Sequence, residues 1–114
     1  MDEADRDYLA DMLRYAEIAV NVLRSAQPAE LGADAPKLQA ILHAVQTVGE
    51  AARQISLEAR AELADLPWQD VIGMRHRLVH DYRRTRVEVV LKTIRDDLPP
   101  LIASLRRALK DSPQ

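Results

Sequence analysis

Arginine and histidine side chains of a kind that can cleave a phosphodiester bond occur together in one short run of the sequence. The run reads Arg75-His76-Arg77-Leu78-Val79-His80-Asp81-Tyr82. A histidine can take the proton from a ribose 2′-hydroxyl or give one to the leaving 5′-oxygen. An arginine can hold the scissile phosphate through two hydrogen bonds and stabilise the charge that develops on it. This chemistry needs no metal ion.

The run also begins a strongly basic segment. Residues 75–86 contain five arginines and two histidines against a single acid, Asp81, although the formal net charge of the whole chain is −2. Any contact with a nucleic acid is therefore expected to use this local patch. Contacts with the phosphate backbone, which carry no base specificity, are predicted for the remaining basic residues. These residues are His76, Arg77, Arg83, Arg84 and Arg86.

Tyr82 follows His80 by two residues, near the expected end of the helix. An aromatic side chain in such a place commonly packs at an interface with its hydroxyl in water. The alternative is a hydroxyl beside a basic patch that is open to modification by a nucleotide.

A helix that carries the run places Arg75 among apolar residues. On a helical wheel the apolar side chains fall within a band roughly 120° wide, with Arg75 in its middle. These side chains are Trp68, Val71, Ile72, Leu78, Val79 and Tyr82. A guanidinium there is either buried and paired with an acid such as Glu50, or opens onto a cleft or an interface.

His80 lies roughly 140° around an ideal helix from Arg75. The two side chains therefore do not converge on one straight helix of one protomer. Either the helix loosens near His80, or a second copy of the chain completes the site across a two-fold axis.

Hydrophobic periodicity predicts the elements that position these residues. A first helix is expected from about Asp5 to about Ser25, followed by a loop over 27–36. A second helix begins at Pro36, with Asp34 as a possible cap, and ends between Ser56 and Leu63.

The third helix is expected to begin near Trp68 and to end between Tyr82 and Arg84. Thr85 and Glu88 then form a predicted capping box for a fourth helix. Pro99 and Pro100 are expected to kink or restart that helix. The prediction is an all-α, up-down bundle of four to five helices.

Composition limits the remaining possibilities. The 114 residues predict a single domain, with an interhelical loop over 28–36 and a ragged C-terminal segment over 110–114. The absence of cysteine excludes disulfides, a thiolate nucleophile and a cysteine-ligated zinc site. The acidic N-terminus is unlike a secretory signal, and no apolar run is long enough to span a bilayer. We expect a cytoplasmic protein that requires no cofactor and does not bind membranes.

The extended motif resembles a known family. Arg75, four residues, His80, one residue and Tyr82 match the R-x4-6-H-x-Y signature of the HEPN superfamily, and the wider context is similar to its HepT-like toxins. The segments that carry the likeness are Leu66–Trp68, Ile72–Arg75, Leu78–Tyr82, Val48–Ala52 and Asp97–Leu101. They lie within a likeness that extends over most of the chain, roughly from Asp5 to Leu109.

This resemblance implies a HEPN-like homodimer in which two motifs face a shared cleft. It implies a toxin of a type VII-like toxin–antitoxin system that cleaves cellular RNA without a metal ion. Arg75 and His80 match the catalytic pair. Tyr82 matches the tyrosine that a minimal nucleotidyltransferase antitoxin modifies with AMP, whose phosphates would close the cleft.

Two other readings stay open from the sequence. One is a non-catalytic helical module that complexes a nucleotidyltransferase or binds nucleotides. The other is a structural bundle in which Arg75 is a buried, ion-paired residue whose replacement by methionine is tolerated. For the catalytic reading, we expect a 2′,3′-cyclic phosphate product, because no metal-activated water is implied.

Overall fold

The computed structural model describes residues 1–32, 34–77 and 87–111, and over these ranges the chain forms helices and no strand. The elements in chain order are α1 (Glu3–Ser25), the 3-10 turn η1 (Pro28–Leu31), α2 (Pro36–Gln54), α3 (Leu57–Glu62), α4 (Trp68–Arg75) and α5 (Val87–Asp111). The molecule is elongated, with extents of 44 × 25 × 20 Å. The predicted all-α fold is confirmed.

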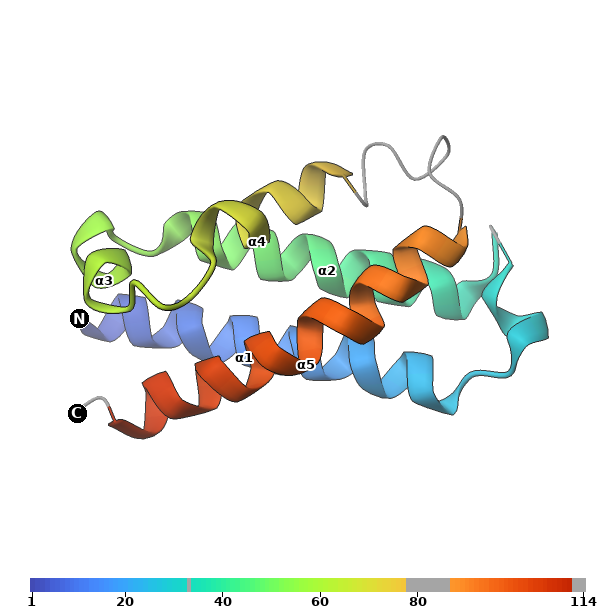
Figure 1. Cartoon of the computed structure of the whole chain (residues 1–114), viewed down its shortest axis with the longest axis horizontal. Coiled ribbons are helices and arrows are strands. Elements are labelled where there is room, and N and C mark those ends of the chain that lie inside the picture. The colour runs from blue at the N-terminus through green and yellow to red at the C-terminus, as the bar shows by residue number, and fades with distance from the viewer. Residues whose placement is uncertain (33, 78–86, 112–114) are drawn as a thin grey trace.

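The long helices pack in pairs (Figure 1). α1 lies against both α2 and α5, and α4 lies against α2. The core between them is built from the apolar stripes that the periodicity indicated, and its fully buried side chains include Leu9, Ile41, Val48, Ile94 and Leu98. Each such side chain contributes about 1.5–3 kcal/mol by leaving water, so these stripes fix how the helices face one another.

The first two helices begin close to their predicted positions. Asp2 caps α1 by accepting a 2.8 Å hydrogen bond from the Asp5 amide, and α1 ends at Ser25 as predicted. α2 begins at Pro36, but Ala35 rather than Asp34 occupies its N-cap. Between them, the predicted loop contains the turn η1, in which the Glu30 carboxylate accepts a 2.8 Å hydrogen bond from the Gln27 amide.

The predicted end of the second helix is wrong. α2 ends at Gln54, Ile55 is extended, and Ser56 begins a separate short helix, α3, that the periodicity did not reveal. The Ser56 hydroxyl accepts a 3.1 Å hydrogen bond from the Ala59 amide and so satisfies a donor of the new helix. Helix α3 therefore turns the chain between α2 and α4.

The two prolines of α5 do not restart the helix. α5 is one element of 25 residues that includes Pro99 and Pro100. Leu98, Leu101 and Ile102 beside them are buried in the core, and this packing maintains the helix although two backbone donors are missing. α5 also reaches Asp111, two residues into the segment that was expected to be ragged. The predicted cap Thr85 lies outside the described residues.

None of the helices in the described ranges is long and apolar enough to cross a membrane.

Candidate functional site

Helix α4 carries the start of the motif, and its position is set by its first residue. The Trp68 indole Nε1 donates a 3.0 Å hydrogen bond to the Leu63 carbonyl, and the ring is only 9% exposed. Val71 and Met74 are buried on the same side of the helix. Met74 was not among the predicted apolar positions, whereas Ile72, which was, is only half-buried. The face against α2 is therefore centred on Val71 rather than on Arg75.

The proposed catalytic residues fall at the limit of the described structure. Arg75 is the last residue of α4, and its side chain lies outside the described part, as do His80 and Tyr82. The predicted pairing of Arg75 with Glu50 is therefore not tested. Glu50 itself forms a 3.8 Å contact between its Oε1 and Nη1 of Arg53 on the same helix.

The geometry of the chain changes just after Arg75. Residues 76 and 77 leave the α-helical pattern and adopt a π-helical turn. Such turns pair residue i with residue i+5 and occur frequently at functional sites. A wider turn is the kind of loosening that one of the two sequence interpretations requires. The position of His80, which would decide between them, lies outside the described residues.

Two of the predicted phosphate-binding residues are described. His76 and Arg77 are both exposed at the end of α4. The Arg77 guanidinium lies back along the helix, where Nη1 is 3.8 Å from the place a Cβ at Gly73 would occupy. The other three residues, Arg83, Arg84 and Arg86, lie outside the described part. The structure thus presents two basic side chains beside the motif.

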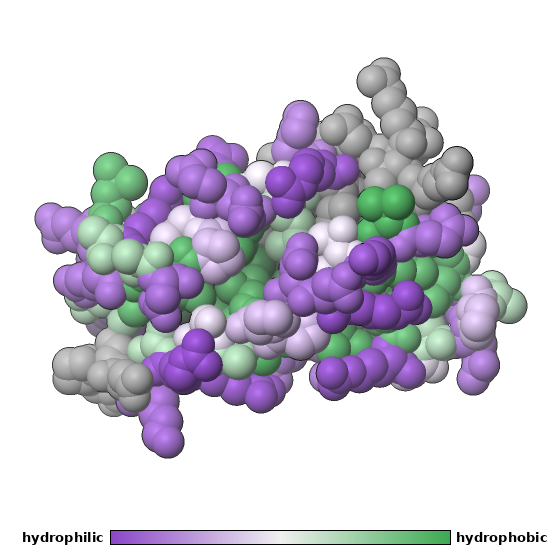
Figure 2. Space-filling view, in the orientation of Figure 1, coloured by the Kyte–Doolittle hydropathy of each residue, from purple (hydrophilic) through white to green (hydrophobic). Residues whose placement is uncertain are grey.

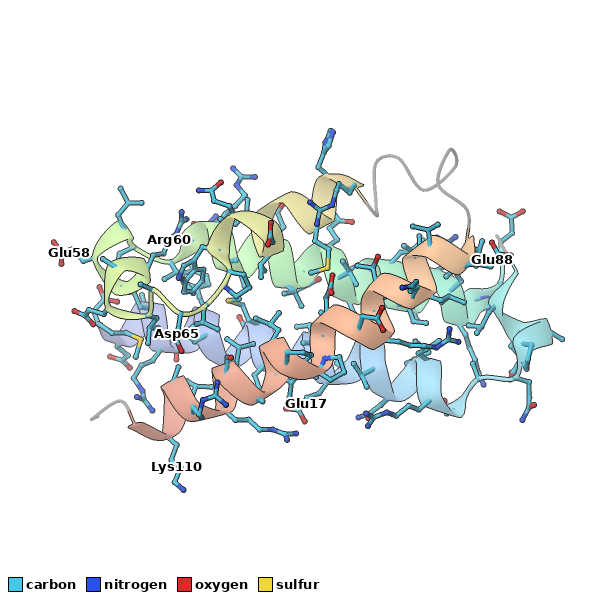
Figure 3. The ribbon with its side chains drawn as sticks, viewed as in Figure 1. Glu17, Glu58, Arg60, Asp65, Glu88 and Lys110 are labelled. Atoms are coloured by element: carbon cyan, nitrogen blue, oxygen red, sulfur yellow. The ribbon has the colours of Figure 1, made fainter. Side chains whose placement is uncertain are left out.

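A groove of about 490 Å³ lies between α4 and α5 beside these residues. The sequence did not predict it. Its lining brings four aspartates and one arginine together from separate parts of the chain. The lining residues are Asp65, Pro67, Asp70, Val71, Met74, Arg77, Asp96, Asp97, Pro100, Leu101 and Ser104. The position of Asp65, on the connection between α3 and α4, is marked in Figure 3.

The groove and the basic run have opposite electrostatic character. Among the lining residues that the structure describes, four carboxylates stand against the guanidinium of Arg77 and make the groove acidic, so it repels a phosphodiester backbone. Within the residues that the structure describes, no three histidine, aspartate or glutamate side chains are grouped so as to hold a metal ion. In the sequence, the pair Asp96-Asp97 is the feature that could have indicated the groove. The pair does not predict a groove until the packing of α5 is known.

Comparisons with known proteins agree with the motif. The family model described as ribonuclease HepT-like matches residues 12–108. A probable ribonuclease HepT from Thermococcus cleftensis is 26% identical over 110 residues, which cover 96% of this chain and all of that protein. A putative RNase from Caldanaerobacter subterraneus subsp. tengcongensis is 24% identical, covering 92% of this chain and 94% of its own length.

A putative RNase from Methanocaldococcus jannaschii is 23% identical, covering 91% of this chain and 86% of that protein. No solved structure matches the chain significantly. The family model spans α2, α3 and α4 and most of α1 and α5. From this match and from the motif at the end of α4, we conclude that the chain belongs to the HepT-like ribonuclease family.

Proposed function

We propose that this protein is a metal-independent endoribonuclease, the toxin of a toxin–antitoxin pair, that cuts cellular RNA in the cytoplasm. The observation that carries the proposal is the family match together with an Arg75–His80 spacing that fits the HEPN signature. Its support from the structure is the position of Arg75 at the last residue of α4, next to the exposed His76 and Arg77.

The proposed reaction is an internal transesterification. His80 removes the proton from the ribose 2′-hydroxyl, and the 2′-oxygen attacks the adjacent phosphorus. Arg75 binds the non-bridging phosphate oxygens and stabilises the additional negative charge. The bond between phosphorus and the 5′-oxygen breaks, and that oxygen takes a proton from a histidinium. The products are a 2′,3′-cyclic phosphate and a 5′-hydroxyl.

The activity is tested with purified protein and an end-labelled RNA in the presence of EDTA. We expect Arg75→Ala and His80→Ala each to lower cleavage by at least about 100-fold. His43→Ala and Arg53→Ala are matched controls, because both side chains are exposed on α2 and neither belongs to the motif, and they should cleave like the parent. Full activity of either motif variant would show that these residues are assigned wrongly.

The product ends test the chemistry separately. Mass spectrometry should find 2′,3′-cyclic phosphates. A 3′-hydroxyl end, or strict dependence on Mg²⁺, would contradict the proposed step. RNA left intact by a folded protein that binds a nucleotidyltransferase tightly would favour the non-catalytic binding module instead.

We further propose that the active species is a homodimer with one cleft shared by two motifs. If Arg75 of one protomer works with His80 of its partner, mixing the two inactive variants creates heterodimers that hold one intact site. Random exchange makes half of the dimers mixed, each with one of its two sites intact, so about a quarter of the parent activity should return. No recovery, with mixed dimers verified, would place both residues in one protomer.

Regulation is proposed at Tyr82. A cognate minimal nucleotidyltransferase would transfer AMP from ATP to the phenol oxygen and release pyrophosphate, and the added phosphate would repel RNA. With such an enzyme and ATP, mass spectrometry should place the adduct on Tyr82 and not on Tyr8 or Tyr15 of α1. Tyr82→Phe should cleave RNA normally and resist inactivation. Inactivation of that variant would exclude Tyr82 as the modified residue.

A further inference from the structure

The acidic groove between α4 and α5 has an apolar floor. Val71 and Met74 from α4 and Leu101 from α5 are each only 4% exposed and line it. Figure 2 shows apolar surface lying between hydrophilic side chains on this face of the molecule. The volume, about 490 Å³, is in the range of sites that bind small ligands or short peptide segments. An apolar floor with a charged rim favours a ligand that has both kinds of group.

The groove wall on α5 also has a backbone acceptor without its helical donor. In an α-helix the carbonyl of residue 96 accepts from the amide of residue 100. Residue 100 is a proline and has no N–H. Asp96 and Pro100 both line the groove, so this turn of α5 borders it. A carbonyl beside carboxylates is suited to a guanidinium or an ammonium group, which only donates.

We propose that this groove is a docking site for a short cationic segment of another protein. Arginine or lysine side chains of the segment would bind the Asp96 and Asp97 carboxylates and the Asp96 carbonyl, and apolar side chains between them would cover Met74 and Leu101. The inference does not depend on the nuclease assignment, because it uses none of the residues placed in that reaction.

Charge selects this occupant over the others. RNA would bring phosphates against four aspartates, which Arg77 alone offsets among the described lining residues. A second copy placed groove against groove would bring carboxylates against carboxylates. The ion pair between Lys92 Nζ and Asp96 Oδ2, at 3.3 Å, is exposed, with 75% and 58% of the two side chains accessible. It is therefore weak and does not neutralise the groove.

The position of the groove gives the docking a consequence. Arg77 lines one part of it and lies two residues after the motif residue Arg75 in the chain. A protein held in the groove would therefore lie beside the motif and would contact Arg77, one of the residues predicted to bind phosphate.

The first test uses a fluorescein-labelled hexapeptide of alternating arginine and leucine, with fluorescence anisotropy as the readout. The full chain should bind it, and Asp96→Asn/Asp97→Asn should weaken binding by about tenfold. Asp7→Asn/Asp11→Asn, a pair of exposed acids on α1, is the matched control and should bind like the parent. A glutamate–leucine peptide should not bind. Equal loss in both variants, or no loss in either, would overturn the proposal.

The second test separates the backbone acceptor from charge. Pro100→Ala supplies the missing amide to the Asp96 carbonyl and should weaken peptide binding severalfold. Pro99→Ala makes the same change at the neighbouring carbonyl of Arg95, and neither Pro99 nor Arg95 lines the groove, so peptide binding should not change. Identical peptide affinity of the two proline variants would refute the role of the Asp96 carbonyl.

The third measurement addresses the competing occupants. Sedimentation and RNA binding are measured on Asp96→Asn/Asp97→Asn. Both should match the parent. If the variant loses self-association but binds the peptide unchanged, the groove is the contact site of a second copy. If it binds RNA more tightly but binds the peptide unchanged, the carboxylates serve only to repel RNA. Either result would overturn the proposal.

Discussion

The Ser56 hydroxyl donates a 2.8 Å hydrogen bond to Oδ2 of Asp5, and the Ser56 amide donates a 2.9 Å hydrogen bond to Oδ1. A carboxylate near the start of α1 thereby holds the residue that caps α3, 51 positions later in the chain. Asp5 is only 4% exposed. Burial raises the pKa of this carboxyl, but hydrogen bonds with Ser56 and Asp2 lower the pKa by more, so the net shift is downward.

This arrangement predicts a pH-dependent stability. The pKa of Asp5 in the folded state lies below its ordinary value of 3.8, so ionised Asp5 stabilises the fold above that value, and the contribution disappears as pH falls through the folded pKa. Asp5→Asn should lower the free energy of unfolding by about 2 kcal/mol at pH 7, and the difference from the parent should be smaller at a pH well below 3.8. Urea unfolding at both pH values measures it. Asp7→Asn, an exposed control on α1, should have little effect, and an equal deficit of Asp5→Asn at both pH values would contradict the assignment.

Arg60 should contribute to stability through the end of α2. Its guanidinium donates to the carbonyls of Ala52, Arg53 and Ile55 at 3.3, 3.0 and 3.1 Å, which satisfies acceptors that a helix end leaves open. Arg60→Met should therefore destabilise the fold by about 1–2 kcal/mol. Urea unfolding followed by circular dichroism tests this. Arg53→Met, an exposed control, should lower the free energy of unfolding far less. Equal losses of stability in the two variants would mean that the hydrogen bonds from Arg60 contribute nothing.

Trp68 should contribute both to the stability of the fold and to RNA cleavage. Replacing it with phenylalanine removes the hydrogen bond to the Leu63 carbonyl and leaves the rest of the ring packed, which should cost about 1–2 kcal/mol. If this contact also sets the position of α4, RNA cleavage should fall at temperatures where the variant is fully folded. Arg60→Met, whose lost hydrogen bonds go to the end of α2, should keep its cleavage rate under the same conditions. Unchanged unfolding and unchanged cleavage by Trp68→Phe would show that the contact is dispensable.

Gly73→Ala should stabilise the protein. Among the described residues, a Cβ there would meet Arg77 Nη1 alone, at an ordinary contact distance of 3.8 Å, and alanine favours a helix over glycine by about 0.5–1 kcal/mol. Differential scanning calorimetry should record a higher Tm. A fall in Tm would show that this face of α4 is more crowded than the single chain reveals, for example by a second protomer.

The fold could be predicted largely because its helices are long and amphipathic. The stripes of α1 and α2 gave their start positions to within two residues, since each helix buries one face. The break at Ile55 could not be predicted, because it depends on Asp5, a residue 50 positions away. The continuity of α5 through Pro99 and Pro100 could not be predicted either, because burial of Leu98 and Leu101 outweighs the local effect of proline.

The basic run of the candidate site could be predicted from the sequence, whereas the acidic groove beside it could not. The basic run that starts at Arg75 is contiguous, so its composition alone marks it. The acidic groove joins Asp65 and Asp70 to Asp96 and Asp97, which approach one another only after α4 has packed against α2 and α5 against α1. Sequence patterns identify groups within an element, whereas convergence between elements requires the packing.

The arrangement of the helices also determines where a label or a tether can be attached. The start of α1 and the end of α5 lie at the same end of the bundle as α3 (Figure 1), and the start of α5 lies toward the opposite end. A fluorophore, an affinity tag or a surface tether attached at either terminus would therefore leave the far end of the bundle unobstructed. A tethered single molecule would therefore present the start of α5, at the opposite end of the bundle, to the solution.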